Sequence, residues 1–351
     1  MQLALRLAAR GASRIRPNPL VGCVIVKHGR IVGQGYHRVF GGPHAEVIAL
    51  KKAGLLSRGS DLYVTLDPCR HTGKTPPCTD AILRAGVSRV ISAFGDPHDW
   101  EHEGERILKK AGLKFSRGLL RDECRVLNQI YLKNVLLSLP YVTVKMATTL
   151  DGKIATASGE SRGISGRASL REVHRLRASV DAILTGSGTV AADDPHLGVR
   201  LVPGKSPLRI ILDTSLKIPL SSAVFRDEHV LVVCGSGASN KKSLEFRKRG
   251  VELICLPEPI SLKHVLSALY ERGVYSILVE AGSTLVTALL RERLVDRYIQ
   301  FVAPKLLGGI HCPTSFEGED PSALSDALRL EKVTVRSFDQ DVMVDGYLRF
   351  Y

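Results

Sequence analysis

The sequence predicts an α/β fold in which short apolar strands alternate with helices, divided over two units. Three observations carry this prediction. The chain has 351 residues, and a single domain usually holds roughly 150. Its hydrophobic content of 44% is enough to build buried cores. Apolar, β-branched runs recur between amphipathic segments, which is typical of strands layered against helices.

The first part of the chain predicts a hairpin followed by alternating helices and strands. An apolar run at 21–26 turns at His28-Gly29 and returns at 31–36. A helix is expected at 44–54, because apolar residues gather on one side of it and Gly54 follows its end. The strands expected next are 61–68, 88–94 and 113–115, and the helices between them are 78–86 and 105–112.

The N-terminal segment 1–16 is rich in arginine, and the first acidic residue of the chain is Glu46. Such a segment resembles an organelle transit peptide. The alternative is a first helix of the fold, with Leu3, Leu5 and the residues from Leu7 to Ala9 packed inward. We favour the helix, because a fold-like segment comes directly after it.

A second unit is expected to begin near Pro140, after a polar stretch. Its strands are almost continuously apolar, as strands buried on both faces are. The expected strands are 180–186, 207–213, 229–235, 251–256 and 275–280, and the expected helices are 166–178, 240–249, 260–272 and 281–292. The alternating tail, 327–351, is expected to add antiparallel strands.

The net charge of +14 is concentrated in the N-terminal part. Residues 1–140 hold 22 basic and 11 acidic side chains, a difference of +11, whereas residues 141–351 hold 27 and 24, a difference of +3. A charge of this size is typical of proteins that bind nucleic acid, a membrane surface or phosphate-bearing substrates. Aromatic residues make up only 5% of the chain, which disfavours the base stacking of nucleic-acid binding.

The seven cysteines are an odd number in a long chain, which argues against a disulfide scaffold and for a reducing compartment. No apolar run approaches the ~18 residues that a membrane-spanning helix needs. We therefore expect a cytoplasmic protein that does not span a membrane.

A group of metal-binding residue types dominates the first part of the chain. His44, Cys69 and Cys78 are three nitrogen or sulfur donors, the number that a catalytic zinc takes from protein. Glu46, two residues from His44 at a helix start, can carry a proton from a zinc-activated water to the leaving nitrogen. This order of residues is the layout of zinc deaminases. The alternatives are structural cysteines, or a closed structural zinc site with His71 as fourth ligand.

The spacing between the two cysteines distinguishes this chain from common cytidine-type deaminases. Eight residues separate Cys69 from Cys78, whereas common cytidine-type deaminases have two. With PNPLVG at 17–22 and the GYH and GGPHAE segments, this resembles the deaminase half of the bifunctional riboflavin-biosynthesis deaminase-reductase. The resemblance implies a cytidine-deaminase-like three-layer αβα domain, zinc, and the substrate 2,5-diamino-6-(5-phosphoribosylamino)pyrimidin-4-one. It also implies substrate-binding roles for Asn18 and His37 in the pyrimidine pocket, and for Arg70, His71, Lys74 and Thr75 in the cysteine loop.

Two departures from that family stand out. Asp67 replaces a glutamate before the Pro-Cys pair. Segment 96–106 keeps Asp96 and Pro97 of the family's Asp-Pro-Asn-Pro stretch and departs from it after Pro97. The family's ribose-phosphate contacts are therefore in doubt for this loop.

The second half has no G-x-G-x-x-G motif after a strand, which argues against an ordinary dinucleotide-binding domain. It has instead KMATTLDGKIATASGES, a basic helix REVHRLRA, then LTGSGTVAADDPHLGVR and VEAGSTL. Strand ends with glycine-rich loops before helices suit phosphate groups. In this order, the four segments resemble the reductase half of the same family, which is related to dihydrofolate reductases and uses NADPH.

That resemblance implies two sets of site residues. The residues implied to touch NADPH are Ala147, Gly163, Thr189, Asp193, Thr214, Gly282, Ser283, Thr284 and Leu285. Those implied to touch the substrate are Ser161, Arg177, Leu197, Arg200 and Glu280. Position 163 usually holds an aromatic residue that could pack on the nicotinamide ring, so its loss could reshape cofactor binding unless Arg162 stacks instead.

Physical roles can be given to five polar residues of this half. Arg177 and Arg200 are suited to bidentate phosphate binding. Asp193 or Lys153 could handle the proton that accompanies hydride delivery. Glu280 could hold ribose hydroxyls. The alternatives are structural: a solvated Arg177, a helix-capping Asp193 and a surface Lys153.

Together these features predict a zinc-dependent pyrimidine deaminase domain at 1–139 and an NADPH-dependent reductase domain at 140–351. The expected reactions are deamination of the diaminopyrimidine, then reduction of the ribosyl group of 5-amino-6-(5-phosphoribosylamino)uracil to ribityl. The alternatives are a deaminase with an impaired reductase half, and a nucleic-acid deaminase or binding protein. The resemblance also implies a homo-oligomer, dimer or tetramer, formed through the reductase half, with no nucleic-acid or membrane partner.

Overall fold

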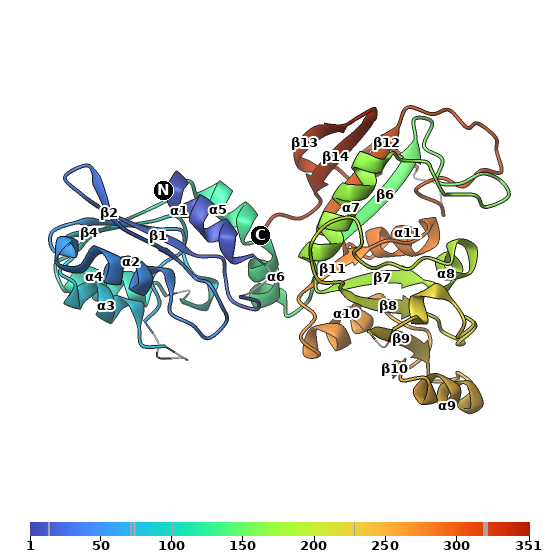
Figure 1. Cartoon of the computed structure of the whole chain (residues 1–351), viewed down its shortest axis with the longest axis horizontal. Helices are drawn as coiled ribbons and strands as arrows, with labels where there is room; N and C mark the ends of the chain where they lie inside the picture. Colours follow the sequence, from blue (N-terminus) through green and yellow to red (C-terminus); the bar gives the residue numbers. More distant parts are fainter. Residues whose placement is uncertain (13–14, 71, 73–74, 100, 228, 319–321) are drawn as a thin grey trace. The chain divides into compact units, whose positions relative to one another are not determined.

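The computed structural model divides the chain into two compact units, Met1–Ser138 with Tyr351, and Leu139–Phe350. It describes residues 1–12, 15–70, 72, 75–99, 101–227, 229–318 and 322–351. Strands and helices alternate in both units (Figure 1), which confirms the predicted α/β class. Within the described residues, no helix is long and apolar enough to cross a membrane.

The N-terminal unit is built on a five-stranded sheet in the order β2-β1-β3-β4-β5. The strands are β1 (Gly22–Lys27), β2 (Arg30–Tyr36), β3 (Asp61–Val64), β4 (Arg89–Ser92) and β5 (Lys114–Arg117). Strand β1 is antiparallel to both of its neighbours, whereas β3, β4 and β5 are parallel to one another. The predicted hairpin with its turn at His28-Gly29 is confirmed.

Helices cover both faces of this sheet. They are α1 (Gln2–Ala8), α2 (Ala45–Ala53), α3 (Cys78–Arg84), α4 (Glu103–Lys110), α5 (Arg121–Leu127) and α6 (Gln129–Leu137). Cys23 and Ile25 of β1 pack with residues of α2, α3 and α4, and Val24, which points the other way, packs with α1. Residues of α5 and α6 form a further cluster that α1 also joins. The unit therefore has three layers, as Figure 1 shows.

The N-terminal segment forms a helix of the fold. Ala4, Leu7 and Ala8 are buried against β1, while Ala9 is exposed, so the expectation that Ala9 packs inward is wrong. Helix α1 ends at Ala8, and a short 3₁₀ turn carries Ala9 to solvent. The approach to β1 is close: a Cβ on Gly22 would lie 2.0 Å from the Ala4 carbonyl oxygen, so only glycine fits there.

The C-terminal unit contains a nine-stranded sheet in the order β10-β9-β8-β7-β11-β6-β12-β14-β13. The strands are β6 (Tyr141–Thr149), β7 (Ala182–Gly186), β8 (Leu208–Leu212), β9 (Val230–Gly235), β10 (Glu252–Leu256), β11 (Ser276–Val279), β12 (Arg297–Ala303), β13 (Glu331–Phe338) and β14 (Asp341–Tyr347). The first seven strands in this order, β10-β9-β8-β7-β11-β6-β12, run parallel to one another. The predicted antiparallel tail is confirmed by β13 and β14.

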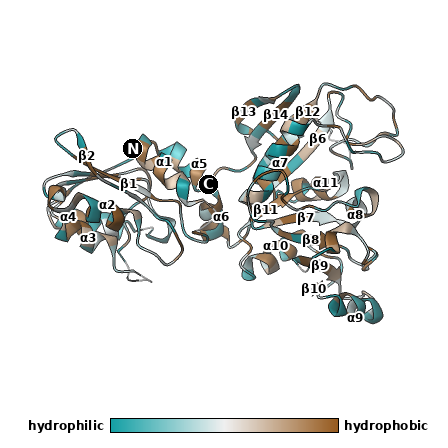
Figure 2. Ribbon diagram, in the orientation of Figure 1, coloured by the Kyte–Doolittle hydropathy of each residue, from teal (hydrophilic) through white to brown (hydrophobic). Residues whose placement is uncertain are grey.

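Helices also cover both faces of the second sheet. They are α7 (Arg167–Ser179), α8 (Ser187–Asp193), α9 (Asn240–Lys248), α10 (Leu262–Glu271) and α11 (Ser283–Arg291). The larger core packs α10 and α11 against one face, and two smaller cores hold residues of α7, α8 and α9. Helix α9 is mostly hydrophilic in Figure 2, and Phe246 is its one buried residue. Helices α5, α6 and α8 were not predicted.

Candidate active sites

The three predicted metal ligands lie together in the N-terminal unit. His44 immediately precedes α2, Cys69 follows β3 in the chain, and Cys78 is the first residue of α3. One donor atom of each lies within 4.8 Å of the other two. The His44 Nδ1 atom is 3.2 Å from the Cys78 sulfur and 3.4 Å from the Cys69 sulfur. The two sulfurs and the ring nitrogen can therefore face one ion.

This donor set fits zinc, which binds thiolate and imidazole ligands and keeps an open position when three protein groups hold it. The backbone N–H of Cys78 donates to the Cys69 sulfur at 3.4 Å. Hydrogen bonding with the Cys78 thiol, and then with His44, lowers the pKa of Cys69, which favours the thiolate form that a metal binds. His71, the fourth ligand of the alternative closed site, lies outside the described residues.

Glu46 lies beside the three donors, in the first turn of α2. Its side chain is buried and shares a hydrogen bond with Cys78. Burial, and then the nearby Cys69 thiolate, raise the pKa of Glu46 to about 7. A carboxyl group with a pKa near neutrality can both accept and release a proton, as the role expected for Glu46 requires.

Asn18 and His37 lie in the same neighbourhood. The His37 Nδ1 atom is 3.1 Å from the Pro43 carbonyl oxygen, so Nδ1 carries the proton and Nε2 accepts from the Asn18 amide at 3.1 Å. The rings of His37 and His44 meet edge to face, with centroids 5.4 Å apart. The Thr75 hydroxyl lies 3.4 Å from His44 Nε2. The structure therefore brings three of the residues expected to bind substrate next to the metal ligands.

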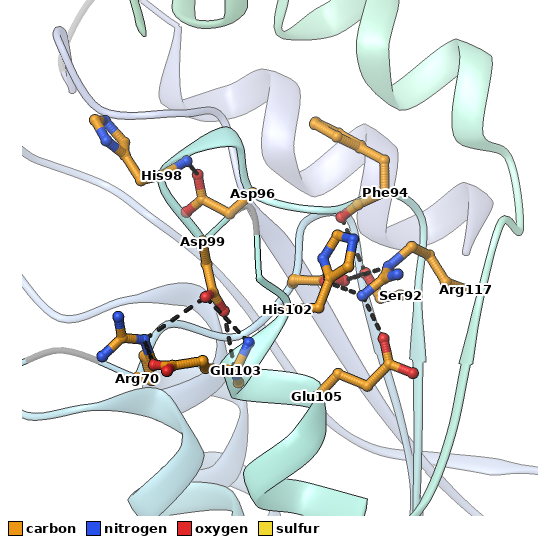
Figure 3. A network of polar contacts seen from close by, with 12 residues as sticks. Arg70, Ser92, Phe94, Asp96, His98, Asp99, His102, Glu103, Glu105 and Arg117 are labelled. Carbon is orange, nitrogen blue, oxygen red and sulfur yellow. Dashed lines mark hydrogen bonds and ion pairs between the residues drawn. The ribbon is translucent and has the colours of Figure 1, made fainter.

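Asp67, the first departure from the family, is held by an ion pair with Arg117, a residue that was not among those predicted. Its buried carboxylate accepts a hydrogen bond from Ser92 at 2.5 Å and forms a two-point contact with Arg117. Arg117 also binds Glu105 at 2.6 Å (Figure 3). Asp67 immediately precedes Pro68 and Cys69, so this network fixes the backbone two residues before one of the metal ligands.

Segment 96–106, the second departure, supplies partners for the cysteine loop. Arg70 forms an ion pair with Glu103 and lies 3.6 Å from Asp99 (Figure 3). The Asp99 carboxylate also accepts hydrogen bonds from the backbone N–H groups of Glu103 and Gly104 at the start of α4. Arg70 is therefore already paired with acidic groups of this chain. Lys74, like His71, lies outside the described residues.

Several of the predicted cofactor residues lie just after parallel strands of the second sheet: Thr214 follows β8, and Gly282 to Leu285 follow β11. Gly282 precedes α11 and donates its N–H to the Thr189 hydroxyl of α8 at 3.0 Å. No described side chain caps the N-terminus of α11, where Ser283, Thr284 and Leu285 form the first turn. The free N–H groups of such a turn suit a phosphate of NADPH. Thr214, after β8, accepts a hydrogen bond from Gly235 through its carbonyl oxygen.

Arg177 and Glu280 form a buried ion pair, with contacts of 2.6 and 3.0 Å. Lys145, inside β6, reaches the same carboxylate at 3.0 Å. Although burial opposes ionisation of Glu280, the charges of Arg177 and Lys145 lower its pKa. Lys145 was not predicted, although a lysine within the otherwise uncharged β6 was a usable signal.

The backbone of Arg200 is held by His174, which, like Lys145, was not predicted. The backbone N–H of Arg200 donates to Nδ1 of the buried His174 at 2.9 Å. Burial, and then the charges of Arg177 and Arg200, lower the pKa of His174 to about 4, so its imidazole is neutral. His174 lies one helical turn before Arg177 in α7, and that spacing in the basic helix was the available signal.

Ser161, Arg162 and Asp193 form one small cluster. The Ser161 hydroxyl donates to the Asp193 carboxylate at 2.6 Å, and Arg162 donates to the Asp193 carbonyl oxygen at 2.9 Å. Gly163 comes next with φ +82, and apart from its chain neighbours no atom of the described residues lies within 4 Å of where its Cβ would be. Lys305, which the sequence analysis did not select, donates to the Gly163 carbonyl oxygen. Among the described residues, no neighbour therefore occupies the first position that a side chain at 163 would take.

Three predicted residues are not brought into these clusters. The Lys153 ammonium donates to the Cys312 carbonyl oxygen at 3.1 Å, and among the described residues no hydrogen bond or ion pair joins it to Asp193. Leu197 is buried in the core beside Ile183. Ala147 is half-buried in β6. Their roles stay predictions.

Comparisons with known proteins assign a family model to most of each unit. Residues 1–94 match the cytidine and deoxycytidylate deaminase zinc-binding region, and residues 140–344 match the RibD C-terminal domain. The riboflavin biosynthesis protein RibD of Escherichia coli is 42% identical over 326 residues, with 88% of each chain covered. RibD of Aquifex aeolicus is 40% identical over 347 residues, 98% of this chain and 96% of the relative.

Solved structures give the same result for the fold. RibD of Acinetobacter baumannii is 38% identical, covers 99% of this chain and 97% of its own, and superposes with a TM-score of 0.85. A Thermotoga maritima protein described as a diaminohydroxyphosphoribosylaminopyrimidine deaminase and 5-amino-6-(5-phosphoribosylamino)uracil reductase is 34% identical, with a TM-score of 0.84 over 99% and 97% of the two chains. The predicted fold class and the predicted cofactors, zinc and NADPH, are confirmed. The chain belongs to the RibD family, and it is an enzyme of riboflavin biosynthesis with a deaminase part and a reductase part.

Proposed function

We propose that residues 1–139 deaminate 2,5-diamino-6-(5-phosphoribosylamino)pyrimidin-4-one and that residues 140–351 reduce the deaminated product. The observation that carries the first assignment is the cluster of His44, Cys69 and Cys78 with the buried Glu46 beside it. The activity described for the Thermotoga relative supports both substrates. The +11 charge of residues 1–140 suits a phosphate ester as the first substrate.

In the deaminase reaction, Glu46, the Asn18–His37 pair and the cysteine loop have different roles. Zinc, when bound, supplies Lewis-acid activation of a water nucleophile. Glu46 takes the proton of that water and delivers it to the leaving nitrogen of the pyrimidine. Asn18 and His37, which hold each other by a hydrogen bond, line the pyrimidine pocket. The cysteine loop binds the phosphoribosyl part of the substrate. Arg70 of this loop is paired with Glu103 until the substrate phosphate competes for the Arg70 guanidinium.

In the reductase reaction, the N-terminus of α11, which has no side-chain cap, and Thr189, which binds the Gly282 N–H, would hold the cofactor, with Ala147, Asp193 and Thr214 as further contacts. NADPH supplies the hydride for the opened ribose. Arg177 and Arg200 bind the substrate phosphate. Asp193, which already accepts from Ser161, is our first candidate for the accompanying proton, and Lys153 is the second. Glu280 holds Arg177, in addition to any contact with ribose hydroxyls.

We also propose a homo-oligomer formed through the C-terminal unit. Strand β13 is the last strand of the described sheet, and seven of its eight residues are exposed. An open edge strand that carries exposed apolar residues, here Val333 and Val335, favours pairing with another chain. Light scattering of the zinc-loaded protein tests this proposal. A monomer at micromolar concentration would contradict it. The cytoplasmic location and the absence of nucleic-acid partners stay predictions.

One alternative remains specific to this chain: a working deaminase joined to an impaired reductase. It is favoured by Gly163, which has no side chain where the family usually has an aromatic one. The two proposals differ in what happens to the deaminated product. Only a working reductase consumes NADPH and adds a pair of hydrogen atoms to that product.

The experiment is a two-stage assay with detection by mass spectrometry. The zinc-loaded protein first receives the diaminopyrimidine substrate without NADPH, and we expect replacement of one amino group by oxygen. NADPH is then added, and we expect the product to gain a pair of hydrogen atoms. Failure of the first stage would reject the deaminase assignment. Failure of the second stage alone would support the alternative of a working deaminase joined to an impaired reductase.

A further inference from the structure

Cys234 and Cys255 face each other on neighbouring parallel strands of the C-terminal unit. Cys234 lies in β9 and Cys255 in β10, and they are direct partners in the strand register. Partner residues of paired strands point their side chains to the same face of the sheet. The two sulfurs are 3.1 Å apart. Neither thiol belongs to the zinc cluster or to the residues expected to bind NADPH.

The backbone around the pair already has the spacing of a disulfide. Neighbouring strands lie about 4.7–4.9 Å apart. The Cα atoms of a disulfide are usually about 4.4–6.8 Å apart, and its sulfurs are bonded at about 2.0 Å. A bond between Cys234 and Cys255 therefore requires rotation of side chains and not movement of a strand.

The two thiols differ in their access to solvent. Strand β10 is the other edge of the described sheet, and Cys255 is exposed on it. Cys234 is buried. Burial, and then the neighbouring Cys255, raise the pKa of Cys234 to about 12. An oxidant from solvent therefore meets Cys255 first, and Cys234 is placed behind it as the resolving thiol.

We propose that Cys234 and Cys255 form a reversible disulfide when the protein meets a hydroperoxide. The Cys255 sulfur attacks one peroxide oxygen and the O–O bond breaks. The other oxygen takes up the proton given up by the Cys255 thiol and leaves as water from hydrogen peroxide, or as an alcohol from an organic hydroperoxide, so that Cys255 becomes a sulfenic acid. The Cys234 sulfur then attacks the Cys255 sulfur, gives up its proton, and displaces the hydroxyl group as water. Two electrons pass from the sulfurs to the peroxide.

The bond would tie an edge strand to the sheet close to the expected cofactor site. Gly235, next to Cys234, donates its N–H to the Thr214 carbonyl oxygen at 2.9 Å. Ser236 donates to the carbonyl oxygen of Leu256, next to Cys255, at 2.8 Å. An exposed disulfide between adjacent strands is of the kind that thiols reduce readily, so the pair is reduced in a reducing compartment and oxidised under peroxide stress.

The test uses the zinc-loaded full chain, so that Cys69 and Cys78 are protected by the metal. The protein is treated with hydrogen peroxide, free thiols are alkylated, and tryptic peptides are analysed without reduction. Trypsin separates the two cysteines, because Lys241 and four further basic residues lie between them. We expect one linked pair of peptides, 227–241 with 250–263, which dithiothreitol separates.

Two serine variants make the result decisive. Cys255→Ser replaces an exposed residue and should remove the linked pair, and Cys312→Ser alters another cysteine of the same unit and should keep it. The proposal is overturned if Cys255 is oxidised to sulfinic acid while Cys234 is still alkylated. It is equally overturned if Cys234 or Cys255 is found linked mainly to a different cysteine.

Discussion

The Glu280 carboxylate accepts two hydrogen bonds from the Arg177 guanidinium inside the C-terminal unit, at 2.6 and 3.0 Å. Both residues were expected to contact substrate separately. Their pairing means that Glu280 fixes the direction of Arg177 before any substrate arrives. Lys145 completes the group, so two cations share one carboxylate. The cluster keeps a net positive charge, which suits a phosphate-bearing substrate.

The first prediction concerns Glu280→Gln. The variant leaves Arg177 and Lys145 without their anion, and we expect the free energy of unfolding to fall by about 3 kcal/mol at neutral pH. The pKa of Glu280 is lowered in the folded state. Its stabilising contribution is therefore complete above the unfolded value, near 4.5, and is lost as the pH falls below it. Urea unfolding from neutral pH down to about pH 2 should show the difference between the two proteins begin to narrow below 4.5 and shrink further as the pH falls toward the lowered pKa of the folded state. A constant difference would contradict the ion pair.

The second prediction concerns the metal. Cys78→Ala removes one of three donors, and we expect the purified protein to lose its zinc. Cys124→Ala is the matched control, because Cys124 is a buried free thiol of the same unit outside the cluster. Metal analysis of both variants beside the unaltered protein gives the answer. Equal zinc in all three would refute the ligand assignment.

The third prediction separates the metal from the proton carrier. Glu46→Gln keeps the size of the side chain and removes its ability to accept a proton. We expect normal zinc content and a loss of about 10²- to 10⁴-fold in deamination rate. Reduction of the deaminated substrate, measured as NADPH oxidation, should be unchanged. Substantial deamination by the variant would show that another group carries the proton.

The fourth prediction concerns His174, whose Nδ1 atom accepts the backbone N–H of Arg200. His174→Leu removes this acceptor, and we expect the reductase KM for the phosphoribosylamino substrate to rise about tenfold, a loss of about 1.4 kcal/mol. His174→Asn restores an acceptor and should recover most of the affinity. The KM for NADPH should stay the same in both variants. Equal effects of leucine and asparagine would argue against the hydrogen bond.

The fifth prediction compares two arginine–aspartate pairs of the N-terminal unit. Arg117→Met leaves the buried Asp67 carboxylate unpaired, and we expect a loss of about 3 kcal/mol in the free energy of unfolding. Arg89→Met breaks a pair of the same geometry with Asp61, but on the surface, and should change stability little. Urea unfolding of the two variants decides between them. A similar loss in both would mean that the burial of Asp67 is unimportant.

Much of the fold was predictable because hydrophobic periodicity specifies strands and helices locally. The β1–β2 hairpin, α2, α7, α10, α11 and the β13–β14 tail lie where the patterns placed them. Helices α5 and α6 were missed, since their short, mixed sequences lack a clear apolar stripe and acquire their place by packing with Leu66 and Phe94. Tertiary packing of this kind leaves no periodic signal.

The metal cluster was predictable because its chemistry restricts both residue types and spacing. His44, Glu46, Cys69 and Cys78 need no partner outside their motif to be recognised. The ion pairs of Asp67 with Arg117 and of Arg177 with Glu280 span 50 and 103 positions of the sequence, and a single sequence does not show which charges meet. Arg117 was missed for that reason, whereas Lys145 within β6 and His174 one helical turn before Arg177 carried local signals that were not used.

The central claim, that one chain carries a working deaminase and a working reductase, is tested most directly by NADPH oxidation. Zinc-loaded Glu46→Gln protein, which cannot make the intermediate, is supplied with 5-amino-6-(5-phosphoribosylamino)uracil and NADPH. We predict NADPH oxidation at the rate of the unaltered protein, with formation of the ribityl product, and no oxidation when the diaminopyrimidine is supplied instead. Absence of NADPH oxidation by the unaltered protein on the deaminated substrate would contradict the account.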